Sequence, residues 1–202
     1  MKPNFPEIKI DEKFYLREIR VSDANEYFKY INHELVKKYV PVNCLPQTEA
    51  KAVSDLLFLI NLFRQKRGIY WGICTKKDDK LIGTCGYESW HRSHARLELV
   101  YDMSPNYWGN NIMHKALKII IAFAFQTMPV NRIEAVTTPD NLKSIKVLTK
   151  LNFKQEGVLR QFRYFKYNYT DVYMFSLLRS ESAHDELYFD NKKNLIKYFH
   201  EN

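Results

Sequence analysis

Residues 97–125 constrain the fold most, because they combine an expected strand, a short turn with a glycine and an expected buried helix. Polar and apolar side chains alternate over residues 96–103, so that one face of the strand carries Leu97, Leu99, Tyr101 and Met103. Residues 104–106 then break the strand. After Gly109 the apolar residues follow the helical period, at Ile112, Ala116, Ile119, Ile120 and Phe123.

A strand that enters a helix through a tight turn directs several free backbone N–H groups at one point. The helix dipole adds partial positive charge there. Gly109 lets the backbone come close to a ligand at this point. The pattern therefore indicates a phosphate site. A plain strand-to-helix corner that binds nothing is the alternative, and it is the commoner outcome for an isolated glycine turn.

Composition favours one domain that spans residues 1–202. The chain has 202 residues, of which 46% are hydrophobic, and this is enough for a sizeable core. Its cysteines, Cys44, Cys74 and Cys85, have no metal-ligand spacing and leave an odd thiol, which indicates a reducing compartment. The first ten residues lack the apolar core of a signal peptide, and no apolar run is long enough to cross a bilayer. We expect a cytoplasmic protein with no membrane partner.

The formal net charge of +8 favours anionic partners such as a phosphorylated cofactor or an acidic protein surface. No nucleic-acid-binding motif is present, so we interpret most of the charge as a diffuse basic surface and expect no direct nucleic-acid partner. His91 and His94 lie in an expected polar loop at residues 90–94. No third ligand follows them at a suitable spacing, so no metal is expected.

The remaining chain predicts further strands and helices. Strands are expected at residues 14–21, 69–75, 81–88, 132–138, 153–159 and 171–178, with a strand or hairpin edge at 162–169. Helices are expected at residues 24–32, after Thr48, and after Asn141. The helix after Thr48 is expected to turn Ala50, Val53, Leu57, Ile60 and Phe63 inward, and the helix after Asn141 is expected to bury Leu142, Ile145, Leu148 and Leu151. Residues 180–202 are expected to form a helical tail through Leu187, Leu195, Ile196 and Phe199.

Several ordered motifs carry a resemblance to a known family. They are Tyr107-Trp108-Gly109 with Ile112-Met113, then Asn141-x-x-Ser144-x-x-x-Leu148-x-Lys150-x-Asn152-Phe153, and EGVLR at residues 156–160. Together they resemble the GNAT superfamily of N-acetyltransferases, most closely its ribosomal-protein branch of the RimJ and RimL type. The resemblance implies an α/β (α+β) fold with a mixed, mostly antiparallel sheet of about seven strands flanked by helices. It also implies a V-shaped splay between the strands at 97–103 and 132–138.

In this family acetyl-coenzyme A enters the splay, so the resemblance implies acetyl-CoA as the co-substrate. Its pantetheine arm would pair with the strand backbone, a backbone N–H near Tyr101 would polarise the thioester carbonyl, and the pyrophosphate would lie on the turn. The implied cofactor-binding residues are Val100, Tyr101, Asp102, Met103, Asn106, Tyr107, Trp108, Gly109, Asn110, Asn111, Ile112, Asn141 and Ser144.

Three asparagines depart from the family pattern. Asn106 stands where the loop commonly has Gln or Arg, Asn111 where it has Gly or Ala, and Asn152 where a later motif has Gly. Asparagine is the residue that best replaces glycine at positive φ, so we expect the backbone path to be kept. Asn111 nevertheless adds a side chain where phosphate approaches, which leaves the cofactor affinity open.

The expected reaction is direct attack of a primary amine on the thioester, with a base that takes the proton. Glu98 matches a carboxylate common in relatives, and the alternative is a surface charge paired with Arg96 or His94. Ser144 matches a position suited to protonating or hydrogen-bonding the departing thiolate. The alternatives are a structural first-turn serine and, for Asn141, a helix cap. We interpret Tyr101 and Trp108 as packing residues.

The resemblance implies an N-acetyltransferase. An α-amine has a reference pKa of about 8 and a lysine amine one of about 10.4, so a protein N-terminus is the easier nucleophile. A small amine, such as a polyamine or an antibiotic, remains an alternative acceptor. A catalytically silent acyl-CoA-binding protein of the same fold is the alternative outside the enzyme class. A homodimer is compatible with the resemblance.

Overall fold

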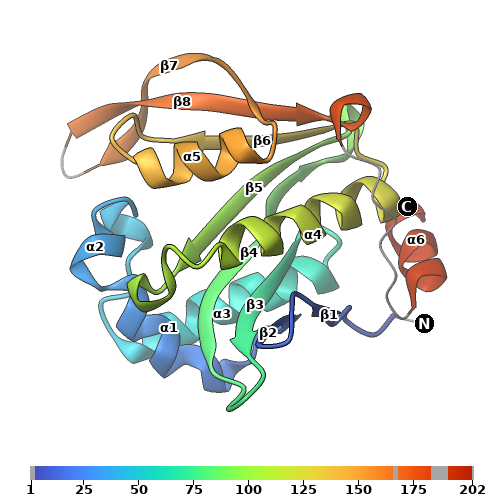
Figure 1. Cartoon of the computed structure of the whole chain (residues 1–202), viewed down its shortest axis with the longest axis horizontal. Helices are drawn as coiled ribbons and strands as arrows, with labels where there is room; N and C mark the ends of the chain where they lie inside the picture. The colour runs from blue at the N-terminus through green and yellow to red at the C-terminus, as the bar shows by residue number, and fades with distance from the viewer. Residues whose placement is uncertain (1–2, 166–167, 183–190, 202) are drawn as a thin grey trace.

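The computed structural model describes residues 3–165, 168–182 and 191–201, and within these ranges it forms an open sheet with helices on both faces (Figure 1). The strands are β1 (Ile8–Lys9), β2 (Phe14–Glu18), β3 (Ile69–Thr75), β4 (Leu81–His91), β5 (Arg96–Met103), β6 (Arg132–Thr137), β7 (Lys154–Phe165) and β8 (Asn168–Leu178). The helices are α1 (Ala24–Ile31), α2 (Glu34–Lys37), α3 (Glu49–Arg64), α4 (Ile112–Thr127), α5 (Leu142–Lys150) and α6 (Lys192–His200).

The sheet has the strand order β1-β2-β3-β4-β5-β6-β8-β7, and every described pair is antiparallel except β5 with β6. That parallel pair is short. It runs from Arg96 opposite Arg132 to Glu98 opposite Glu134, and the two strands then separate. The expected mixed sheet and its V-shaped splay are therefore confirmed. We refer to the space between the diverging parts of β5 and β6 as the wedge.

Alternation along the central strands explains the helices on both faces. In β3, Trp71 and Ile73 pack on the side of α4, whereas Tyr70 and Cys74 pack on the side of α1 and α3. In β5 the side of α4 holds Leu97, Leu99 and Met103 in its core, with Tyr101 packed against them, as the alternating pattern predicts. Val100 of β5 packs against the other core, so this strand contributes side chains to both.

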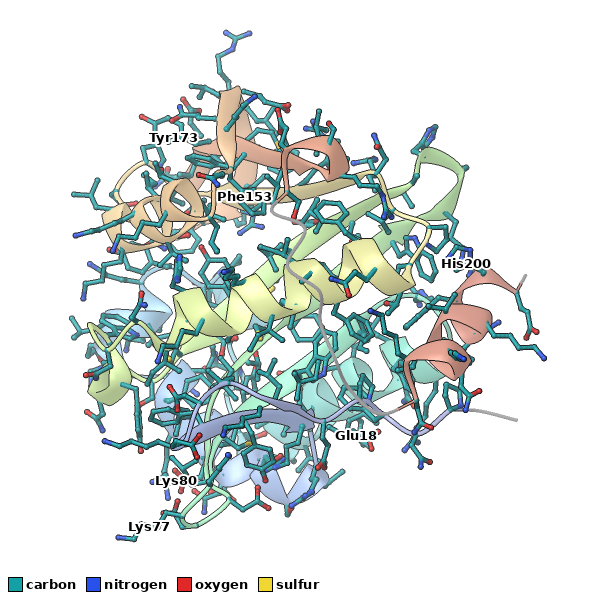
Figure 2. All side chains as sticks on the ribbon, turned by 45° about the vertical axis from the view of Figure 1, so that its right-hand side comes forward. Glu18, Lys77, Lys80, Phe153, Tyr173 and His200 are labelled. Atoms are coloured by element: carbon teal, nitrogen blue, oxygen red, sulfur yellow. The ribbon has the colours of Figure 1, made fainter. Side chains whose placement is uncertain are left out.

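The C-terminal helix α6 closes the core at the end of α4 that lies far from the wedge (Figure 1). Phe199 is fully buried and makes edge-to-face contacts with Phe63, Trp90 and Phe123. The neighbouring Tyr198 donates a hydrogen bond of 2.7 Å from its hydroxyl to Phe63 O. Figure 2 shows His200 at the end of this helix. Helix α6 occupies part of the expected tail at residues 180–202, and Leu187 lies outside the described residues.

The helix boundaries follow local chemistry. Thr48 caps α3 by accepting a hydrogen bond from Lys51 N, as expected. Asn111 and Asn152 adopt φ of 59° and 63°, and Gly109 has φ of 80°. The prediction that asparagine keeps the backbone path of glycine is confirmed at both positions. No helix in the described ranges has the length and apolar character needed to cross a bilayer.

Several strand boundaries differ from expectation. Within the described residues the sheet has eight strands instead of about seven, because β1 adds a two-residue edge. The expected strands at 153–159 and 162–169 largely form one strand, β7, with an irregularity near Gln161, whose φ is 52°. Strand β4 runs through Trp90 and His91, which pair with Leu97 and Arg96, so the polar loop there begins later.

Two expected helix faces were also partly wrong. In α3 the buried residues are Ala52, Leu56, Ile60, Leu62 and Phe63. Leu57 is exposed, because residues 56–60 are all apolar and the period therefore leaves the inward face undetermined there. In α5 Leu148 is buried, but Leu142 is 70% exposed because it lies in the first turn, beyond the core.

Candidate active site

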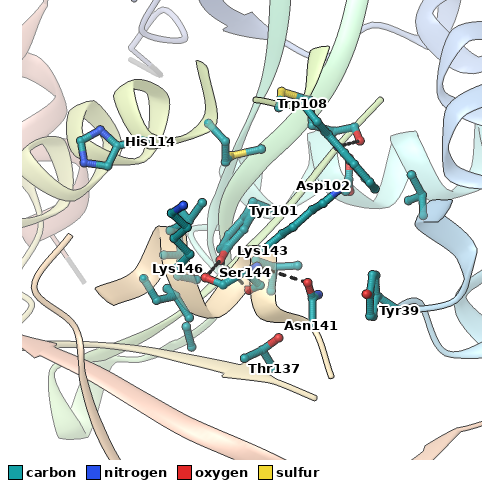
Figure 3. Close-up of a pocket in the computed structure, with 18 of the residues that line it drawn as sticks. Tyr39, Tyr101, Asp102, Trp108, His114, Thr137, Asn141, Lys143, Ser144 and Lys146 are labelled. Carbon is teal, nitrogen blue, oxygen red and sulfur yellow. Dashed lines mark hydrogen bonds between the residues drawn. The ribbon is translucent and has the colours of Figure 1, made fainter. Parts of the chain in front are cut away.

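A cavity of about 840 Å³ occupies the wedge (Figure 3). The diverging parts of β5 and β6 form its floor, the first turn of α4 and the loop before it form one wall, and α5 forms another. On the remaining side lie α2 with the segment that follows it, and Arg163 of β7. Tyr39 from this segment donates a hydrogen bond of 3.5 Å to Asp140 O, which joins it to the loop before α5.

A polar contact inside the cavity joins β5 to α5. The Tyr101 hydroxyl lies 2.7 Å from Ser144 Oγ, and Asn141 Oδ1 accepts a hydrogen bond of 3.2 Å from Ser144 N (Figure 3). Asn141 is thus the cap of α5, and its carboxamide nitrogen is not used for the cap. Burial raises the pKa of the Tyr101 phenol, and its hydrogen bond with Ser144 offsets only part of this effect. Tyr101 is therefore neutral at physiological pH.

Asp102 is the one carboxylate among the described residues that line the cavity. Its oxygens accept hydrogen bonds from the Tyr30 hydroxyl at 2.6 Å, from Thr84 Oγ1 at 2.9 Å and from Thr84 N at 3.1 Å. Burial raises the pKa of Asp102, and these hydrogen bonds act in the opposite direction. The side chain thus fixes α1 against the sheet below the wedge.

The loop between β5 and α4 divides into two groups of side chains. Trp108, Gly109, Asn111 and Ile112 line the cavity, whereas Asn106, Tyr107 and Asn110 do not. Residues Pro105–Tyr107 form a short 3-10 turn, and the side chains of the second group make contacts outside the cavity. Tyr107 packs edge-on against Phe14, and the Asn110 carboxamide donates hydrogen bonds to the Tyr107 and Trp108 carbonyls. The sequence therefore located the loop correctly but did not separate its two faces.

Basic side chains also line the cavity: Lys143, Lys146 and Lys150 of α5, together with His114 of α4. Lys143 Nζ lies 3.8 Å from the centre of the Trp108 ring, so this cation–π contact joins two walls of the cavity (Figure 3). Sequence reasoning missed these residues. Their signal was present in the spacing of the three lysines, which places them on one face of α5.

Comparison with known proteins decides the family. The acetyltransferase (GNAT) domain family matches residues 13–154 of this chain. The chain belongs to the GNAT family. The enzyme class expected from the sequence, an N-acetyltransferase, is therefore confirmed, and so is the fold.

Three relatives illustrate the match. The chain is 36% identical over 173 residues to the uncharacterized N-acetyltransferase p20 of Bacillus licheniformis, covering 85% of this chain and 96% of that protein. The structure of a ribosomal-protein-S5-alanine acetyltransferase from Vibrio fischeri superposes with a TM-score of 0.77 at 25% identity. The match covers 88% of this chain and 98% of that one. RimL, a ribosomal L7/L12 alpha-N-protein acetyltransferase solved with coenzyme A, has a TM-score of 0.78 at 16% identity. The match covers 85% of this chain and 97% of that one and shows a shared fold. The resemblance to the ribosomal-protein branch of GNAT proteins is confirmed.

Within this GNAT structure Glu98 lies at the apex of the wedge, because it is the last residue of β5 that pairs with β6. Neither expected surface partner binds it: Arg96 pairs with Glu134, and the partner of Glu98 is Arg163, whose Nη2 lies 3.7 Å from Glu98 Oε1. Glu98 does not line the cavity itself, whereas Arg163 does.

Glu88 is a second carboxylate that the sequence did not single out. The register of β4 and β5 is interrupted between Tyr87 and Trp90, and Glu88 lies in this irregularity opposite Glu98. Partial desolvation raises the pKa of Glu88, the like charge of Glu98 raises it further, and Arg163 lowers it. The sequence did not predict that Glu88 and Glu98 lie opposite each other, because their proximity depends on the register of β4 and β5.

The arrangement is suited to group transfer from a polyphosphate-bearing donor. Open N–H groups at the start of α4 and the surrounding cations favour an anion at one end. Hydroxyl groups of Tyr101 and Ser144 lie in the middle, and carboxylates lie near the apex. In the described part of the chain, no three His, Cys, Asp or Glu side chains gather as metal ligands would.

Proposed function

We propose that this protein transfers the acetyl group of acetyl-CoA to the α-amine of a protein N-terminus. The observation that carries the proposal is the wedge itself: a cavity of about 840 Å³ opens where β5 and β6 stop pairing, beside the N-terminus of a 16-residue helix. Unpaired strand backbone suits the amide groups of pantetheine, and the helix terminus suits pyrophosphate. The relatives that act on ribosomal proteins support a protein acceptor.

The residues on β5, on the loop and on α5 receive distinct roles. Backbone groups of residues 100–103 bind the pantetheine arm, and the N–H groups near Gly109, Asn111 and Ile112 bind the diphosphate. The carboxamide nitrogen of Asn141 adds a donor to the pantetheine. Lys146 and Lys150, which line the cavity, add positive charge for the phosphates. Asn106, Tyr107 and Asn110 shape the loop and have no direct contact with the ligand.

The transfer needs a base at the apex of the wedge. We assign this role to Glu98, which accepts the amine proton through water while Arg163 holds its carboxylate. Ser144 hydrogen-bonds the departing sulfur. The conversion of Glu98 to glutamine should lower kcat far more than acetyl-CoA affinity, and an unaltered pH–rate profile in that variant would remove Glu98 as the base.

The test is a titration with acetyl-CoA by calorimetry, followed by measurement of free thiol with a panel of amines. The panel contains peptides with N-terminal alanine or serine, the same peptides blocked at the N-terminus but carrying lysine, a polyamine and an aminoglycoside. We expect binding and turnover on the peptides with a free α-amine. Turnover on the polyamine or aminoglycoside alone would assign a small-molecule acceptor. Binding without turnover on any amine would identify a silent acyl-CoA-binding protein.

A further inference from the structure

Two hydroxyl groups face each other inside the wedge. The Tyr101 hydroxyl lies 2.7 Å from Ser144 Oγ, and both residues line the cavity (Figure 3). We propose that Tyr101 is a positioning residue that turns the hydroxyl proton of Ser144 toward the sulfur atom of the departing thiolate. This inference rests on the acetyl transfer proposed above. It gives a function to a side chain whose sequence context indicates packing alone.

The direction of this hydrogen bond follows from the chemistry of the two groups. A phenol, with a reference pKa of about 10, is a much stronger acid than an aliphatic alcohol and is therefore the better donor. Tyr101 donates, and Ser144 Oγ accepts. The other acceptor in reach, Ser144 O, is 3.4 Å from the phenol oxygen and forms the weaker contact. With its oxygen occupied by Tyr101, the Ser144 hydroxyl directs its own proton into the cavity.

A hydrogen bond also holds the backbone of Ser144 in place. Ser144 N donates to Asn141 Oδ1 at 3.2 Å, so the first turn of α5 cannot rotate without loss of its cap. The ring of Tyr101 packs against the core on the side of α4. The two hydroxyls are therefore placed by two separate elements, β5 and α5, and their distance is fixed by the core between those elements. Such preorganisation makes a donor effective for charge that develops during a reaction.

The transfer balances without a proton from either hydroxyl. The amine nitrogen forms a bond to the thioester carbon, and the carbonyl electron pair moves onto oxygen. When that pair returns, the carbon–sulfur bond breaks and its electrons go to sulfur. The proton lost from nitrogen converts the thiolate to a thiol, so the products are an amide and free coenzyme A. Ser144 and Tyr101 keep their protons and stabilise sulfur by hydrogen bonding. This fits a buried phenol whose pKa is raised.

A double-mutant cycle tests the dependence of Tyr101 on Ser144. We expect Ser144→Ala to lower kcat about 100-fold and Tyr101→Phe about tenfold, with KM for acetyl-CoA within about twofold of the wild type. In the Ser144→Ala background, Tyr101→Phe should have no further effect on kcat. If Tyr101 only packs, its replacement costs the same factor in both backgrounds. That result overturns the inference.

Tyr87→Phe is the matched control. Tyr87 is also a buried tyrosine on a central strand, and its hydroxyl donates a hydrogen bond of 2.8 Å to Ile120 O, outside the cavity. Its loss should lower stability and leave kcat unchanged. A similar loss of kcat in Tyr87→Phe and Tyr101→Phe would show that both act through general destabilisation, and would overturn the positioning role.

A second measurement needs no acceptor. The thiol of bound coenzyme A is titrated by its ultraviolet thiolate absorbance, with the complex of desulfo-coenzyme A subtracted to remove protein groups. A donor aimed at sulfur stabilises the thiolate, so the bound thiol should titrate about one pH unit lower in the wild type than in Ser144→Ala. Tyr101→Phe should lie between them. Identical titration in the wild type and Tyr101→Phe would overturn the inference.

The two proposals fail in different ways. If the wild type turns over no amine, the acetyl-transfer proposal fails, and the thiol titration still decides whether Tyr101 orients Ser144. If turnover is normal and Tyr101→Phe costs the same factor with and without Ser144, acetyl transfer stands and the role of Tyr101 falls.

Discussion

Gly109 combines two properties that an anion-binding loop requires. Its φ is 80°, a value that residues with a side chain rarely adopt, and a Cβ placed on it would meet no atom within 4 Å. The residue therefore leaves an approach to the backbone open beside the first turn of α4.

We predict that Gly109→Trp weakens acetyl-CoA binding at least tenfold while the protein stays folded, because the indole would occupy the space of the diphosphate. Calorimetric titration measures the affinity, and circular dichroism checks the fold. Gly157→Trp is the control, since a Cβ placed on Gly157 would also meet no atom within 4 Å, but Gly157 lies on β7 outside the cavity. Equal affinity in both variants would contradict the loop assignment.

The charge of Glu98 affects the pKa of the neighbouring Glu88. Partial desolvation raises the pKa of Glu88, and Glu98 adds repulsion between like charges. Glu98→Gln removes that repulsion, so the pKa of Glu88 should fall and its titration should move to lower pH. Arg163→Gln removes an attraction and should move it to higher pH. Carboxyl NMR of the two variants measures both directions. A shift of the same sign in both would refute this interaction.

At the residue scale, sequence reasoning located residues of short local motifs better than it predicted long-range contacts. The patterns at Gly109, Asn141 and Ser144 were sufficient to place all three at the cavity, because they lie in short local motifs. Arg163 was not predictable, because β7 brings it to Glu98 from a distant part of the chain. The catalytic roles of Glu98 and Ser144 stay predictions.

The elements beside the wedge begin and end at asparagines. Asn111 precedes α4 with φ of 59°, and Asn152 follows α5 with φ of 63°. Both positions need the left-handed region, which costs most residues about 1–2 kcal/mol. The two asparagines thus preserve turns at which the family pattern has small residues.

We predict that Asn111→Gly and Asn152→Gly change the free energy of unfolding by less than about 0.5 kcal/mol, whereas the alanine variants lose about 1 kcal/mol. Urea unfolding measures these values. Because Asn111 lines the cavity, Asn111→Gly should also bind acetyl-CoA at least as tightly as the wild type. Alanine variants as stable as the glycine variants would contradict the backbone explanation.

Element types followed from periodicity, but element ends and faces did so less reliably. The alternation in β5 and the long apolar pattern of α4 both predicted the observed burial. In α3 the neighbours Leu56 and Leu57 are equally apolar, and only packing against the sheet decides that Leu56 is inside. The continuation of β4 through His91 depends on pairing with Arg96, which is a tertiary property.

The whole molecule depends on two cores that meet at one sheet, and α6 completes one of them. The aromatic rings of Phe63, Trp90 and Phe123 all contact Phe199, which has no exposed surface. Lys66 Nζ also donates a hydrogen bond of 2.9 Å to Glu201 O, next to the end of α6. The expectation that residues 1–202 form a single domain stays a prediction.

We predict that Phe199→Ala lowers the free energy of unfolding by about 3–5 kcal/mol, because it leaves a cavity beside the rings of Phe63, Trp90 and Phe123. Leu142→Ala is the matched control and should change it by less than about 0.5 kcal/mol, since Leu142 is 70% exposed. Chemical denaturation measures both. A small loss in Phe199→Ala would show that α6 is only weakly attached to the body.

The position of α6 also bears on when this protein can first become active. Chains leave the ribosome from the N-terminus, and early segments begin to fold during synthesis. Here the rings contributed by α3, β4 and α4 are translated before Phe199 of α6, which packs against them. A nascent chain that already contains the whole wedge would therefore still expose an aromatic surface until α6 has also left the ribosome.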